Sequence, residues 1–146
     1  MPKKPTAEDA KIIMRLYDLR REPEMRKARA WFASFVPRNA DDMVQVMNGV
    51  PPQENAWFRQ VSSYWDMAAS FVLHGALNEG LFIDNSGEMF FVLGKLYPFL
   101  KEIREKTNTP YLQRVEKVAT RTKEARDRLQ MMVKRAEARR AAAAKS

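Results

Sequence analysis

The chain has 146 residues, of which 45% are hydrophobic and 30% charged, and this composition fits a single globular domain with its own core. It has no cysteine and one histidine, which excludes disulfides, thiolate nucleophiles, thiolate metal sites and multi-histidine metal sites, and no cofactor is expected. The start of the chain, MPKKPTAEDAK, lacks the apolar run of a signal peptide, and no membrane span is expected because no apolar run approaches ~20 residues. A cytoplasmic location is therefore expected.

The formal net charge of +8 is unevenly distributed along the chain. Residues 114–146 hold eleven basic and four acidic residues, so nearly all of the net charge lies there. A basic segment of this kind suits polyanions or an acidic partner, and it is equally compatible with a solvated helix face.

Three helices are predicted in the first 50 residues from their capping and turn residues. Thr6 followed by Asp9 resembles a capping box, proline is favoured in a first helical turn, and asparagine is a good N-cap. These signals place the helices at about 7–21, from Pro23 to before Pro37, and from Asn39 to Asn48.

The stretch 52–78 predicts a helix that is apolar on most sides, with its polar residues in one narrow stripe of the helical wheel. A helix of this kind is either the buried axis of a helical domain or a membrane span. Arg59, Asp66 and His74 argue against a membrane span. We therefore expect this helix to be the central helix of the fold.

The next segments are predicted from a short apolar run and a second capping pair. Leu81–Ile83 is expected to be a connector that tucks under the bundle, and Asn85 with Glu88 resembles the cap of a helix over about 86–106. Pro98 should kink this helix, because its ring opposes the carbonyl of Gly94.

A final helix is predicted from Tyr111, with apolar residues recurring in steps of three and four over 112–132, as in a coiled-coil seam. After Glu137 the alanine-rich end has nothing to bury and should fray. The predicted fold class is all-α. It is a bundle of about five or six helices over 6–110 with a central buried helix, followed by a long basic C-terminal helix and frayed tail over 111–146.

The polar stripe of the central helix is the first candidate site, and its members are Arg59, Ser63, Asp66, Ser70 and His74. Residues four apart lie side by side on a helix, so an arginine, an aspartate and a histidine on one face are compatible with a small-anion site or acid–base chemistry. The alternative is a structural role, in which Asp66 pairs with an arginine from 20, 21, 26 or 29, and this alternative is favoured.

A second candidate is the arginine cluster at the junction of the first two helices, formed by Arg20, Arg21 and Arg26. Guanidinium groups gathered in this way suit a phosphate. Because Asp18, Glu22 and Glu24 lie in the same stretch, a self-satisfied ion-pair network is the favoured interpretation.

Three stretches, Leu16–Arg26, Ser63–Ala69 and Asn85–Met89, resemble a family of small all-helical bacterial proteins of unknown function. The resemblance covers roughly residues 12–106 and implies an all-α domain. It carries over no catalytic residues, and the basic C-terminal segment lies outside it.

The basic residues of the last helix are the third candidate site, as contacts to a polyanion: Arg121, Lys123, Arg126, Arg128, Lys134, Arg135, Arg139 and Arg140. Such residues contact phosphates without reading a base sequence. The leading hypothesis is a non-enzymatic helical interaction module that meets a protein partner or a second copy of itself through 112–132. The alternatives are weak nonspecific nucleic-acid binding by the same helix, and a small-anion site or enzyme at Arg59, Asp66 and His74.

Overall fold

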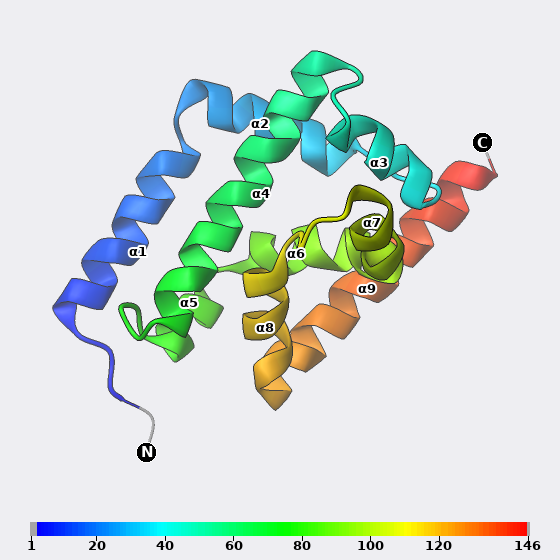
Figure 1. The fold of residues 1–146 in the computed structure, drawn as a ribbon. Helices are drawn as coiled ribbons and strands as arrows, with labels where there is room; N and C mark the ends of the chain where they lie inside the picture. The colour runs from blue at the N-terminus through cyan, green and yellow to red at the C-terminus, as the bar shows by residue number, and fades with distance from the viewer. Residues whose placement is uncertain (1–2, 146) are drawn as a thin grey trace.

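The computed structural model describes residues 3–145 and is all-α over that range (Figure 1). The predicted number of five or six helices is too low, because the described residues form nine α-helices and one 3-10 helix. The elements are α1 (Ala7–Arg20), α2 (Pro23–Ser34), α3 (Ala40–Met47), α4 (Pro52–Leu73), α5 (Glu79–Asp84), α6 (Gly87–Leu96), η1 (Tyr97–Phe99), α7 (Leu100–Thr107), α8 (Gln113–Arg121) and α9 (Lys123–Ala144).

The first helices begin at the residues that their caps predict. The Thr6 hydroxyl accepts the N–H of Asp9, and the Asp9 carboxylate accepts the N–H of Thr6 at 2.7 Å, which completes the capping box of α1. Pro23 is the first residue of α2, as expected for a residue that has no N–H to leave unpaired. Asn39 caps α3 by accepting the N–H of Asp42 at 3.1 Å.

The helix α4 lies at the centre of the fold and packs against α2, α3 and α8, while α1 lies along one edge of the molecule (Figure 1). Its buried residues include Phe58, Val61 and Trp65, as the apolar circumference of 52–78 predicts. The helix ends at Leu73 because the chain turns at Gly75, which has a left-handed φ of +77°.

The predicted connector at Leu81–Ile83 is instead part of α5. Asn78 starts this helix, since its side chain accepts the N–H of Leu81 at 2.9 Å. Phe82 and Ile83 are buried, and the Phe82 ring contacts that of Trp65 of α4, so the expected apolar segment is a short helix.

Pro98 interrupts the predicted 86–106 helix as expected, and the chain passes through a 3-10 turn between α6 and α7. Gly94 has a further role, because α6 and α9 approach each other closely there. A Cβ at residue 94 would lie 2.6 Å from the Cβ of Met132. Glycine is therefore the residue that allows this helix pair to pack.

The predicted C-terminal helix is two helices, divided at Thr122, whose hydroxyl accepts the N–H of Ala125 at 3.1 Å and caps α9. The apolar stripe expected to pair with another chain is buried within this one, with α8 against α4 and α9 against α6. The alanine-rich end, where fraying was expected, is helical through Ala144. Over residues 3–145, every helix is too short or too polar to cross a membrane.

Candidate functional site

The three ionisable residues of the polar stripe on α4 do not converge. Arg59 and His74 are fifteen positions apart, which is about 22 Å along a helix axis. Arg59 donates from Nε to the Asn55 side chain at 3.0 Å, and His74 is exposed at the C-cap of α4. None of the cavities described below is lined by these residues. The arrangement gives no support to an acid–base site formed by the three together.

The two serines of the stripe are bonded within their own helix. Ser63 donates to the carbonyl of Gln60 at 3.5 Å, and Ser70 donates to the carbonyl of Met67. Hydroxyl groups engaged with carbonyls of the preceding turn are a common arrangement on helices. Neither serine hydroxyl therefore joins Asp66 in a common binding site.

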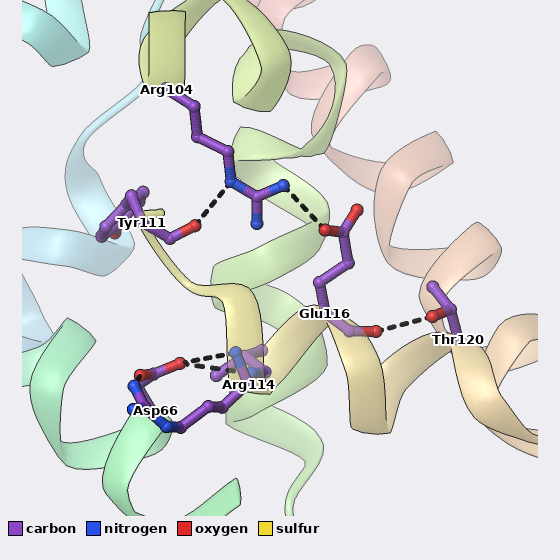
Figure 2. A network of polar contacts seen from close by, with 7 residues as sticks. Asp66, Arg104, Tyr111, Arg114, Glu116 and Thr120 are labelled. Atoms are coloured by element: carbon purple, nitrogen blue, oxygen red, sulfur yellow. Dashed lines mark hydrogen bonds and ion pairs between the residues drawn. The ribbon is translucent and has the colours of Figure 1, made fainter. Parts of the chain in front are cut away.

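Asp66 has a structural role that the sequence predicted, but its partner is Arg114 rather than an arginine of the first two helices. One carboxylate oxygen accepts the backbone N–H groups of Arg114 and Val115 at 3.1 and 3.2 Å, and the other is 3.0 Å from the Arg114 guanidinium (Figure 2). The N-cap of α8 is Leu112, which has a φ of +56° and no side-chain cap of its own. Asp66 therefore caps α8 from a different helix.

A second polar group in Figure 2 fixes the turn between α7 and α8. Arg104 donates from Nε to the carbonyl of Tyr111 at 2.9 Å and pairs with Glu116 at 2.8 Å. The Tyr111 hydroxyl lies 2.6 Å from the Ser62 hydroxyl, and burial raises the pKa of Tyr111 far above its usual value. This network joins α4, α7 and α8, although Arg104 Nη2 is shielded from solvent and has no hydrogen-bond acceptor among the described residues.

The arginines of the second candidate cluster do not form a phosphate cradle. The Arg20 guanidinium stacks over the rings of Tyr17 and Trp65, at 5.7 and 5.5 Å from their centroids, and Arg21 also lies over Tyr17. Arg26 is exposed on α2. The cluster is instead divided between aromatic faces and solvent, so the ion-pair network that the sequence favoured does not describe it either.

Two of the three stretches that carry the family resemblance, Ser63–Ala69 and Asn85–Met89, meet at Glu88. Its carboxylate pairs with Arg29 of α2 at 2.7 Å and accepts the indole N–H of Trp65 of α4 at 3.1 Å. The predicted role of Glu88 as a capping partner of Asn85 is wrong, because Ser86 and not Asn85 is the N-cap of α6. Sequence reasoning missed this contact because a pair 59 positions apart leaves no local signal.

An aromatic pocket of about 210 Å³ lies beside this network, between α1, α4 and α5. We define the aromatic pocket by its lining residues Ile13, Met14, Leu16, Tyr17, Arg20, Tyr64, Trp65, Phe82 and Asn85. At its base the Tyr64 hydroxyl donates to the carbonyl of Leu16, and burial raises the pKa of Tyr64 to about 12, so this phenol stays protonated.

The rim of the aromatic pocket leaves apolar and cationic groups without partners. Met14 is 61% exposed and Tyr17 is 47% exposed, although both are large hydrophobic side chains. Arg20 Nε is shielded from solvent and has no hydrogen-bond acceptor among the described residues. Buried donors are normally satisfied, so this one calls for an acceptor that the described residues do not provide.

The third candidate set, the basic residues of the C-terminal segment, is partly committed within the chain. Arg121 pairs with Glu79 at 2.9 Å and Lys123 pairs with Asp127 at 2.9 Å. Three further arginines donate to backbone carbonyls: Arg126 to Thr120, Arg128 to Ile83 and Arg139 to Ala33. Lys134 and Arg135 are exposed on α9, and Arg140 lies over the ring of Phe99.

Comparison with known proteins places the chain in one family. Residues 5–122 match a family model described as a domain of unknown function (DUF4760). No curated protein and no solved structure matches the chain. In the part of the chain that the structure describes, no three His, Cys, Asp or Glu side chains gather as metal ligands. The match covers α1 to α8, including the aromatic pocket and the Glu88 network, and the chain therefore belongs to the DUF4760 family.

Proposed function

We propose that the chain is a non-enzymatic interaction domain and that the aromatic pocket receives an apolar side chain of a protein partner. The observation that carries the proposal is the exposure of Met14 and Tyr17 at the rim of a pocket with an aromatic floor. Large apolar side chains gathered at a surface hollow are typical of protein-binding surfaces.

The chemistry of the partner follows from the cation at the pocket. Arg20 Nε lies shielded from solvent without an acceptor, and Arg21 stands beside it over the Tyr17 ring. A carboxylate of the partner would accept from Arg20 as the apolar side chain fills the pocket, which favours a segment with an acidic residue next to an apolar anchor.

The basic helix α9 gives less support to nucleic-acid binding. Arg128 and Arg139 of α9, and Arg121 at the end of α8, are already bonded to a carboxylate or to carbonyls, so fewer guanidinium groups are free for phosphates than the sequence suggests. Self-association through 112–132 also has less support, because that apolar stripe is buried. The surface around α1 is therefore the better candidate for a protein partner.

Selection from a displayed peptide library tests the proposal with the full chain as bait. We expect enriched peptides to combine a large apolar residue with a neighbouring Asp or Glu. Binding of these peptides should fall at least tenfold in Met14→Glu and in Arg20→Gln. Met131→Glu is the matched control, since Met131 is 52% exposed on α9, far from α1, and this variant should bind normally.

Two outcomes would contradict the proposal. One is enrichment of peptides without acidic residues, and the other is binding that Met14→Glu does not weaken. Melting curves of each variant establish that a loss of binding does not arise from unfolding.

A further inference from the structure

A second cavity, with no lining residue from α1, lies between the α2–α3 linker, α6 and α9. Its volume is about 220 Å³. We call it the basic pocket, and its lining residues are Val36, Pro37, Phe91, Lys95, Met132, Arg135, Ala136, Arg139 and Arg140. The walls are mainly apolar, four of the nine residues are cationic, and none is acidic.

The deepest cation of the basic pocket is Lys95, which is only 3% exposed. Its ammonium group donates to the carbonyls of Phe32 and Phe35 at the end of α2 and lies 4.6 Å from the ring centroid of Phe91. The C-terminal end of a helix attracts a cation because its last carbonyls lack partners. Lys95 and the contact from Arg139 to Ala33 are accounted for by this role.

The same explanation does not extend to Arg135 and Arg140. Arg135 is exposed at the rim of the pocket. Arg140 stacks over Phe99 at 5.0 Å, and its Nη1 is shielded from solvent without a hydrogen-bond acceptor among the described residues. Shielded guanidinium N–H groups normally have an acceptor, and no carboxylate of the lining supplies one to Arg140.

We propose that the basic pocket binds a small carboxylate with an apolar body, with the carboxylate on Arg140 and the body between Phe91 and Met132. Arginine suits this role because its N–H groups match the two oxygens of a carboxylate. The volume is below the about 300–1,000 Å³ usual for drug-sized ligands, which limits the body to a short chain or a single ring. The proposal is independent of the aromatic pocket, which lies against α1.

Hexanoate is a suitable probe, and three comparison compounds test the carboxylate and the apolar body separately. Hexanol keeps the apolar body without the charge, acetate keeps the charge without the body, and inorganic phosphate is an anion without a body. We expect hexanoate to bind the full chain at least tenfold more tightly than each of the three in calorimetric titrations. Methyl NMR signals of Met132 and Val36 should shift on binding, which locates the probe.

Three variants test the residues. Arg140→Gln should weaken hexanoate binding at least fivefold, while Lys134→Gln, an exposed cation of the same helix outside the lining, should leave it unchanged. Ala136→Leu should block binding by filling the cavity without removing a charge. Circular dichroism melts verify that each variant is folded.

The proposal is overturned by any of three results. The first is equal binding of hexanoate and hexanol, which would remove the role of the carboxylate. The second is phosphate binding as tightly as hexanoate, which would make the pocket a general anion site. The third is hexanoate binding that Arg140→Gln leaves unchanged.

Discussion

Replacing Asp66 should destabilise the fold mainly through the loss of a helix cap. The Asp66 side chain is 21% exposed and the Arg114 side chain is 55% exposed, so their ion pair should contribute at most about 1 kcal/mol. The two backbone N–H groups of α8 that Asp66 accepts correspond to an N-cap, whose loss costs about 0.5–2 kcal/mol. Asp66→Ala should therefore lower the free energy of unfolding by about 0.5–3 kcal/mol.

Urea denaturation followed by circular dichroism distinguishes the cap from the ion pair. Arg114→Ala removes the pair and leaves the cap, so it should cost at most about 1 kcal/mol. The exposed Lys123–Asp127 pair supplies the control, and Asp127→Ala should cost at most about 0.5 kcal/mol. If Arg114→Ala is as costly as Asp66→Ala, the capping argument is refuted.

Two further predictions concern the packing of α6. Burial lowers the pKa of Lys95 to about 7 from its ordinary 10.5, so the unfolded chain holds this proton more tightly than the folded chain. The folded chain is therefore destabilised by the full amount below pH 7, and this destabilisation decreases as the pH rises toward 10.5. The free energy of unfolding should rise between pH 7 and 9.5 by up to about 1.4 kcal/mol per pH unit. Lys95→Met should abolish this rise in denaturation curves at fixed ionic strength, and a wild-type curve parallel to that of the variant would contradict the prediction. Gly94→Ala should cost about 1–3 kcal/mol, because its Cβ would lie 2.6 Å from the Cβ of Met132, and Gly80→Ala, which meets nothing closer than 3.5 Å, should be near neutral in the same denaturation assay.

The elements that the sequence predicted well are those whose signals are local. Thr6, Pro23 and Asn39 mark helix starts through contacts within three or four residues, and the structure confirms each of them. The predicted helix bounds are wrong at residues of types that occur both at helix starts and elsewhere in or after helices. The predicted central helix ends at Asn78, whereas Asn78 begins α5 in the structure, and the predicted C-terminal helix runs through Thr122, whereas Thr122 divides α8 from α9.

The candidate site was harder to predict because its contacts are between distant parts of the chain. Helical spacing placed Arg59, Asp66 and His74 on one face but carried no information about which helix faces each of them. The partner of Asp66 is 48 positions away. Its position depends on the left-handed backbone at Leu112, which no sequence pattern predicts. The aromatic pocket has no signal in the sequence either, because the apolar pattern of 52–78 does not distinguish Trp65, which lines the pocket, from the other buried residues of this helix.

The packing of α9 on α6 also bears on how the chain acquires its structure during synthesis. The family match ends at Thr122, the residue that caps α9, so the helix that covers α6 lies entirely beyond the matched region. Leu129 and Val133 are buried on that helix, and they are translated well after α6. A chain that has emerged from the ribosome without α9 therefore has an open apolar face on α6, and such a face is exposed to chaperones and to aggregation until α9 covers it.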